Sequence, residues 1–187
     1  MFFRWGIRGA QIETWLRDAE IMSGVKWRVH HEQKPLGTGG GVRACLDLCA
    51  GDILVANADS LLLFPLPQLL NGFKDTSLNG ALIGVPMPDC SRYGALQFNA
   101  GGLLTGFREK QPGEGEINSG LYVFRKAVIA PFPENTPLSM EYDIIPKLII
   151  ERKRLKVFHA EKNTPFIDIG TPESLTQADQ FIRRYLI

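Results

Sequence analysis

The sequence has few cysteines, almost no net charge and no long apolar run. Its three cysteines are an odd number, which disfavours a disulfide framework. With 21 Lys and Arg against 20 Asp and Glu, the formal net charge is +1, and without a long basic run we expect no nucleic-acid binding. The most apolar stretch, residues 61–70, is interrupted by Pro65 and Pro67 and is too short to span a bilayer. The apolar first five residues have neither a cationic lead nor a cleavage site, so we predict a soluble, cytoplasmic protein without a signal peptide.

A chain of 187 residues, 44% of them hydrophobic, is long enough to form one packed core. No repeat, linker or low-complexity stretch divides it, so we predict a single domain over residues 1–187. Candidate strands alternate with candidate helices, and short turns join the middle strands, which predicts an α/β fold with a mixed sheet flanked by helices. The candidate strands are residues 25–32, 52–56, 80–85, 94–98, 103–108, 120–124, 155–160 and 166–169.

Capping residues mark the starts of two predicted helices. Ser139 can cap a helix that runs to about residue 154. Thr171, followed by Pro172 and Glu173, is a stronger start signal, for a helix that runs to about residue 185. The apolar run at residues 52–56 is typical of a strand that is buried on both faces of a parallel sheet.

A glycine-rich segment, Leu-Gly-Thr-Gly-Gly-Gly at residues 36–41, lies between a predicted strand and a predicted helix. Glycines let the backbone approach a ligand closely, and a helix start offers unpaired N–H donors. The segment lacks the lysine of a P-loop and the spacing of the dinucleotide fingerprint, so neither is predicted. A tight turn without a ligand is the other interpretation.

Two aspartates follow predicted strands, where ligands of open α/β sheets bind. Asp59 comes directly after the apolar run at 52–56, and a carboxylate there suits magnesium, which would in turn hold substrate phosphates. Asp168 precedes the helix capped by Thr171 and could be a second ligand of the same metal. Alternatively, Asp59 caps the next turn and Asp168 solvates its loop.

A third polar group lies between residues 94 and 119. Lys110 could meet a phosphate, while Glu109 and Asn118 could form hydrogen bonds with hydroxyl groups. The other interpretation is that each is a surface residue near a turn.

Taken together and in order, the segments resemble the sugar-phosphate nucleotidyltransferase family from about residue 9 to residue 182. The branch that transfers guanylyl groups to D-glycero-D-manno-heptose 1-phosphate is the most similar, and the mannose, glucose and N-acetylmuramate branches share much of the pattern. Eight segments carry the resemblance: GAQIETWL, EQKPLGTGGGV, LVANADSL, SRYGALQF, GFREKQP, INSGLYVF, SMEYDIIP and FIDIGTPESL.

The resemblance implies a Rossmann-like nucleotide-diphospho-sugar transferase fold and a reaction that needs Mg2+. A nucleotidyl group, GMP from GTP, would pass to a sugar 1-phosphate, a manno-heptose 1-phosphate, with release of pyrophosphate. The implied catalytic residues are Asp59, Asp168 and Lys110. In full, the implied roles are nucleobase contact for Gly37, Thr38 and Gly39, metal binding for Asp59 and Asp168, sugar contact for Gly94, Glu109 and Asn118, and phosphate contact for Lys110.

The sequence departs from the family pattern at two places. It contains no GGxGTR loop, and Ala58 stands where the family usually has glycine between Asn57 and Asp59. We therefore expect an incomplete fold whose first strand and nucleotide loop are missing, and a strand at 25–32 that lacks a neighbour on one side. The alternative function is a non-catalytic fragment or a sugar-phosphate-binding module, and assembly into a homo-oligomer stays open.

Overall fold

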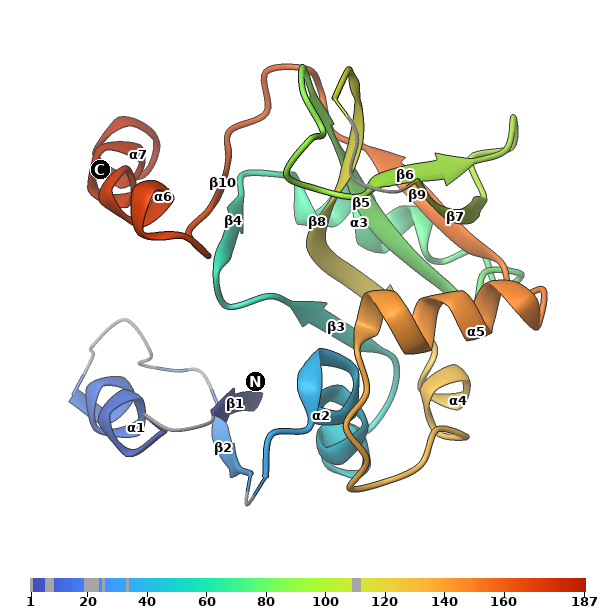
Figure 1. Ribbon diagram of the computed structural model, residues 1–187. Coiled ribbons are helices and arrows are strands. Elements are labelled where there is room, and N and C mark those ends of the chain that lie inside the picture. Colours follow the sequence, from blue (N-terminus) through green and yellow to red (C-terminus); the bar gives the residue numbers. More distant parts are fainter. Residues whose placement is uncertain (1, 6–8, 19–23, 25, 33, 109–111) are drawn as a thin grey trace. The chain divides into compact units, whose positions relative to one another are not determined.

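The computed structural model describes residues 2–5, 9–18, 24, 26–32, 34–108 and 112–187 (Figure 1). Its contacts group the chain into two compact units. Unit 1 consists of Met1–Ala50 and Ile129–Pro146, and unit 2 consists of Gly51–Val128 and Lys147–Ile187. The single domain over residues 1–187 stays a prediction.

Unit 1 contains a pair of parallel strands that the sequence did not fully predict. Phe2–Trp5 forms β1, which pairs in parallel with β2 (Arg28–His31). We assigned no strand to the first residues, so β1 is an addition to the prediction. The strand expected at 25–32 was to lack a neighbour on one side, and among the described residues β2 pairs with β1 alone. Helix α1 (Gly9–Asp18) joins the two strands, and its Glu13 carboxylate lies 3.0 Å from Nε2 of His31.

Helical segments complete unit 1. Helix α2 (Gly37–Cys45) continues into the short 3-10 helix η2 (Leu46–Leu48), and Met140–Ile144 forms a π-helical segment, η3. Arg43 of α2 is buried and donates from Nε to the carbonyl of Phe132, at 2.8 Å, and from Nη2 to Glu134, at 2.7 Å. This arginine ties α2 to the segment that leads to η3.

Unit 2 is built on a mixed six-stranded sheet, as the sequence predicts. The strands are β3 (Ile53–Ala56), β5 (Gly80–Met87), β6 (Ala95–Phe98), β7 (Leu104–Arg108), β8 (Gly115–Phe124) and β9 (Leu155–His159). The central strand β8 pairs antiparallel with β3, β5 and β6, and β6 pairs antiparallel with β7. Among the described strands of this sheet, β5 and β9 form the parallel pair.

The core of unit 2 lies between this sheet and helix α3 (Leu66–Gly72). Leu69 of the helix packs in one cluster with Ile83 of β5 and Ile117 of β8, and all three are fully buried. Each such side chain contributes about 1.5–3 kcal/mol to stability. At Gly72 a Cβ would lie 2.3 Å from the ring of Phe158, so the absence of a side chain lets the helix approach β9.

Strand β3 differs from its prediction. It pairs antiparallel with β8, and while Ile53 is buried, Leu54 is 47% exposed. The expectation of a strand buried on both faces of a parallel sheet is therefore wrong. A run of four apolar residues fits both a buried strand and a half-exposed one, because periodicity over so short a run does not distinguish them.

The two predicted caps are both present. The Ser139 side chain accepts from the N–H of Tyr142, and Thr171 forms a capping box with Ser174. The first helical run ends earlier than predicted, with α5 at Ile145–Ile150, and Arg152 follows with a φ of 57°. The second predicted helix divides into α6 (Pro172–Thr176) and α7 (Ala178–Tyr185). The short helix α4 (Lys126–Ile129) was not predicted.

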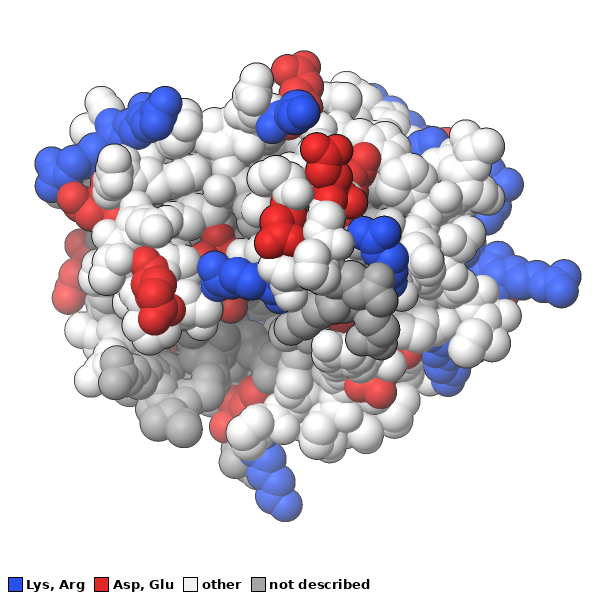
Figure 2. Space-filling view, turned by 45° about the horizontal axis from the view of Figure 1, so that its top comes forward, with Lys and Arg blue, Asp and Glu red and all other residues white. Residues whose placement is uncertain are grey.

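Two observations on the described part of the chain concern membrane crossing and surface charge. No helix there is both long enough and apolar enough to cross a bilayer. Acidic and basic side chains are interspersed on the face that Figure 2 shows, in keeping with the net charge of +1.

Candidate active site

A short strand pair in unit 2 brings the two predicted aspartates together. β4 (Ser60–Leu62) pairs antiparallel with β10 (Phe166–Asp168), and Ser60 lies directly opposite Asp168 (Figure 1). The N–H of Ile169 donates to the carbonyl of Asp59 at 2.7 Å and extends the pairing by one step. Asp59 and Asp168 therefore lie at the same end of the ladder.

The hydroxyl of Ser60 lies between the two carboxylates. Its Oγ is 3.1 Å from Oδ2 of Asp168 and 3.4 Å from Oδ1 of Asp59, so these two carboxylate oxygens are at most 6.5 Å apart. The prediction that the aspartates come close is confirmed. Their role as metal ligands stays a prediction.

Gly170 borders the same carboxylates. Its N–H donates to Oδ1 of Asp168 at 3.1 Å. A Cβ at this position would lie 3.1 Å from Oδ1 of Asp168 and 3.9 Å from Oδ2 of Asp59. Asp59 is exposed and Asp168 is half-buried, so glycine leaves the space beside both carboxylates open to a ligand.

The chemistry of this pair fits magnesium. Carboxylate oxygens are hard ligands, and magnesium in proteins is commonly held by one or two carboxylates, with water and substrate phosphates completing the shell. Within the described ranges, no group of three or more His, Cys, Asp and Glu residues could hold a metal. Magnesium held by Asp59 and Asp168 would have coordination positions for substrate phosphates and water.

The negative charge of Asp168 affects the pKa of Tyr93. Burial raises the pKa of the Tyr93 phenol, the negative charge of Asp168 raises it further, and Arg92 lowers it. The guanidinium carbon of Arg92 lies 5.7 Å from the centre of the Tyr93 ring. At neutral pH the phenol is therefore protonated.

The predicted nucleobase residues, Gly37, Thr38 and Gly39, belong to unit 1 and start helix α2 instead of forming a separate turn. The Gly39 N–H donates to the carbonyl of Leu138 at 2.8 Å, and the Thr38 hydroxyl accepts from the N–H of Met140 at 2.9 Å. We expected unpaired N–H donors at this helix start, but the N–H groups of Gly39 and Gly40 both donate to the Leu138 carbonyl. The nucleobase role of these residues stays a prediction.

The predicted sugar residues are only partly within the described ranges. Gly94 precedes β6, and a Cβ there would lie 3.4 Å from the carbonyl oxygen of Arg108, at the end of β7. Asn118 lies on β8, where its amide donates to the Tyr122 hydroxyl at 2.5 Å and accepts from the N–H of Gly120 at 3.2 Å. Glu109 and Lys110, which follow β7, lie outside the described residues.

Sequence reasoning missed two residues at the carboxylate pair. Ser60 was given no role, although its place directly after Asp59 puts it on the strand that faces Asp168. Tyr93 lies within the SRYG segment, but only Gly94 of that segment was assigned a contact. Neither position has a local signal that identifies its partner, because each partner comes from a distant segment.

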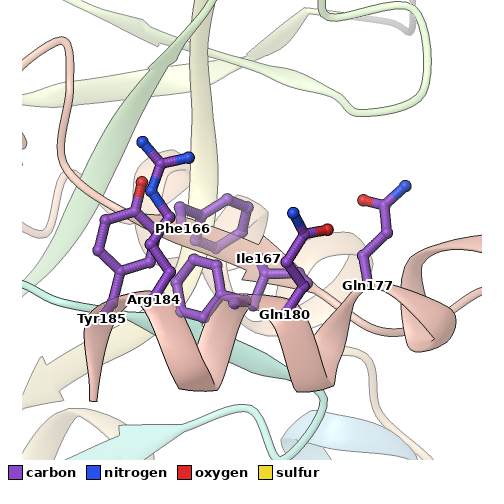
Figure 3. A pocket seen from close by; sticks show the side chains of 7 residues that line it. Phe166, Ile167, Gln177, Gln180, Arg184 and Tyr185 are labelled. Atoms are coloured by element: carbon purple, nitrogen blue, oxygen red, sulfur yellow. The ribbon is translucent and has the colours of Figure 1, made fainter. Parts of the chain in front are cut away.

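A concave surface with a volume of about 250 Å3 lies between β10 and α7 (Figure 3). Figure 3 shows the Gln177 and Gln180 amides toward one end and the Arg184 guanidinium near the Tyr185 hydroxyl at the other. The lining residues are Phe166, Ile167, Gln177, Gln180, Phe181, Arg184 and Tyr185. None of the predicted site residues lines this cleft.

Comparison with known proteins shows what the chain resembles. A family model described as nucleotidyl transferase matches residues 9–184. The chain is 27% identical over 183 residues to D-glycero-alpha-D-manno-heptose 1-phosphate guanylyltransferase of Aneurinibacillus thermoaerophilus, an alignment that covers 97% of this chain and 77% of that protein. It is 28% identical over 168 residues to the mannose-1-phosphate guanylyltransferase catalytic subunit beta of Xenopus tropicalis, covering 87% of this chain but only 46% of that one.

Comparison with a solved structure gives the same result. HddC from Yersinia pseudotuberculosis has a TM-score of 0.84 and 28% identity, over 96% of this chain and 76% of that one. Its complex with GMP-PN gives a TM-score of 0.83. The resemblance inferred from the eight segments and the mixed α/β fold are thereby confirmed. Because the family model matches almost the whole length, the chain belongs to the nucleotidyl transferase family.

Proposed function

We propose that the chain is a sugar-1-phosphate nucleotidyltransferase that transfers GMP from GTP to a manno-heptose 1-phosphate. The observation that carries the proposal is the pair formed by Asp59 and Asp168, two carboxylates from distant segments at most 6.5 Å apart. Two named relatives support the choice of substrates, because one is a heptose 1-phosphate guanylyltransferase and a structural relative was solved with GMP-PN.

The reaction joins two anions. An oxygen of the sugar phosphate attacks the α-phosphorus of GTP, the bond between that phosphorus and the bridging oxygen breaks, and pyrophosphate leaves. Positioning and neutralisation of charge supply most of the catalysis in such transfers, so neither a protein nucleophile nor an acid–base pair is required. Magnesium held by Asp59 and Asp168 would supply part of that neutralisation.

The other predicted residues divide the substrates between them. Lys110 would neutralise the sugar phosphate, and Glu109, Asn118 and Gly94 would contact the sugar. On this proposal Asn118, whose amide also donates to the Tyr122 hydroxyl and accepts from the Gly120 N–H, would contact a sugar hydroxyl. Gly37, Thr38 and Gly39 would contact the nucleobase.

Pyrophosphate release tests the proposal directly. The 187-residue chain is incubated with magnesium, GTP and D-glycero-D-manno-heptose 1-phosphate, and the nucleotide sugar is identified by mass spectrometry. We expect Asp59→Asn to reduce the rate by about 100-fold or more, since the charge that positions the phosphates is lost. Asp179→Asn, which removes an exposed carboxylate paired with Arg183, is the matched control and should leave the rate unchanged. Equal rates for wild type and Asp59→Asn would contradict the proposal.

Substrate comparison tests the finer assignment. Mannose 1-phosphate and glucose 1-phosphate, each with GTP, ATP, UTP and dTTP, are assayed in the same way. A preference for a gluco sugar, or for a nucleotide other than GTP, would move the chain to another branch of the family.

The second candidate function is sugar-phosphate binding without turnover. It is favoured by one observation, which is that these 187 residues contain no GGxGTR motif. Binding of heptose 1-phosphate by calorimetry without any pyrophosphate release would support this candidate over the first.

A further inference from the structure

We propose that Ser60 is a positioning residue for the carboxylate pair, and that its hydroxyl presets Asp168 and Asp59 to accept a divalent cation. This inference rests on the proposed function, because it assumes that the pair binds a metal. Ser60 would not touch the substrate. It would act through the two carboxylates on either side of its hydroxyl group.

The hydrogen bonds around the pair are unequal. Each carboxylate oxygen of Asp168 accepts one hydrogen bond. Oδ2 accepts from the Ser60 hydroxyl at 3.1 Å, and Oδ1 accepts from the Gly170 N–H at 3.1 Å. Two donors on different segments fix the plane of that carboxylate. Since an ionised carboxylate has about four lone-pair sites, free sites remain for a cation.

Asp59 is held less firmly. Among the described residues its carboxylate has one hydrogen-bond contact, from Ser60 at the longer distance of 3.4 Å, and the side chain is exposed. We infer that Asp168 is the fixed ligand and Asp59 the adaptable one. Ser60 is the group that both share.

The hydroxyl has one proton and two acceptors. It can donate to only one carboxylate at a time, and it separates two like charges that otherwise repel each other. Without it, Asp168 would lose one of its two donors, and Asp59 would lose the contact that keeps it on the side of Asp168. A cation would then have to gather two less ordered ligands, and its affinity would fall.

The strand pairing lets the hydroxyl be removed with little change to the fold. Ser60 and Asp168 face each other in a β-ladder whose backbone hydrogen bonds do not depend on the serine side chain. Alanine at residue 60 removes the donor, while threonine keeps a hydroxyl and suits a strand. Ser77 provides a matched control, because its hydroxyl and N–H lower the pKa of Asp75, an exposed carboxylate in another loop.

The experiment measures Mn2+ binding to the full chain, in the presence of GTP, by electron paramagnetic resonance. We expect Ser60→Ala to weaken Mn2+ binding by about fivefold to tenfold, the effect of one lost hydrogen bond of ordinary strength, because the hydroxyl acts through the carboxylates and does not touch the cation. Ser60→Thr should stay within about twofold of wild type, and Ser77→Ala should not differ from it. Circular dichroism on the same samples checks that each variant is folded.

The outcomes separate the two proposals. Unchanged Mn2+ affinity in Ser60→Ala, together with a large loss in Asp59→Asn, would overturn the role of Ser60 and leave the proposed function standing. Equal affinities in wild type and Asp59→Asn would overturn both. If Ser60→Ala does not fold, Ser60→Val provides the second test, because valine has the shape of threonine and suits a strand but carries no hydroxyl. Wild-type affinity in a folded Ser60→Val would then overturn the inference.

Discussion

Arg125, which directly follows β8, connects three separate stretches of unit 2. Its Nε donates to the carbonyl of Leu78 at 3.2 Å, and its Nη2 donates to the carbonyls of Phe73 and Asp75 at 2.8 and 3.0 Å. Nη1 lies 2.5 Å from Oδ2 of Asp52, just before β3, and the guanidinium stacks 4.0 Å from the centre of the Phe73 ring. We predict that Arg125→Ala is one of the most destabilising single changes in this unit.

The contacts of Arg125 contribute unequally to the free energy of unfolding. The ion pair with Asp52 contributes little, because the two side chains are 25% and 42% exposed and such pairs are worth at most about 1 kcal/mol. The three carbonyls matter more, since hydrogen bonds from a charged donor contribute about 1.5–3 kcal/mol each, although such contributions do not add fully. Stacking on Phe73 adds about 0.5–1 kcal/mol. We therefore expect a loss of roughly 3–4 kcal/mol, a large part of the ~5–15 kcal/mol that stabilises a typical domain.

Urea unfolding followed by far-ultraviolet circular dichroism measures this loss. Arg125→Lys should recover less than half of it, because an ammonium keeps the charge but cannot reach several carbonyls with a planar fork. The matched control is Arg183→Ala, whose ion pair with Asp179 is about 70% exposed on both sides and should cost less than about 0.5 kcal/mol. A loss in Arg125→Ala no larger than in Arg183→Ala would refute this reasoning.

Two further predictions concern packing and pH. Gly39→Ala should lower the free energy of unfolding by about 1–3 kcal/mol, because its Cβ would lie 2.7 Å from Cδ1 of Ile144. The control Gly51→Ala should be neutral, because no atom lies within 4 Å of the added Cβ. Equal melting temperatures of the two variants would contradict this prediction. The pKa of Asp89 is lowered by hydrogen bonds from the side chain and N–H of Ser91, so its contribution to stability is present above the unfolded pKa and is lost as pH falls through the lower folded pKa. Asp89→Asn should therefore be less stable than wild type at pH 7 and lose less on acidification below about pH 4, and parallel melting curves against pH would count against it.

Features that depend on neighbouring residues in the chain were predictable from the sequence. The caps at Ser139 and Thr171 are formed as expected, because a cap is made by a side chain and an N–H a few residues away. Asp59 and Asp168 were each placed at a strand end by the same kind of local reasoning. Their meeting depends on the antiparallel β4–β10 pair, in which Asp168 ends β10 and Asp59 directly precedes β4, and local reasoning does not identify that pairing.

Features set by distant partners were not predictable. The antiparallel pairing of β3 with β8 depends on a strand about seventy residues away, which a four-residue apolar run does not identify. Glycine is a weak helix former, yet α2 starts within its glycine run. There the carbonyl of Leu138 accepts from Gly39, and the side chain of Ile144 fills the space beside it. Ser60 was missed for the same reason, since its importance comes from Asp168.

The β4–β10 pair also sets a time order for the assembly of the candidate site during synthesis. Ser60 and Asp168 are 108 residues apart, so at typical rates of translation the first carboxylate is added to the chain roughly 5 to 20 s before the second. A nascent chain can complete much of the sheet around β5 and β8 within that interval and still have no paired carboxylates. Cation binding would then begin only when β10 reaches β4, so it would report a late step in the folding of unit 2.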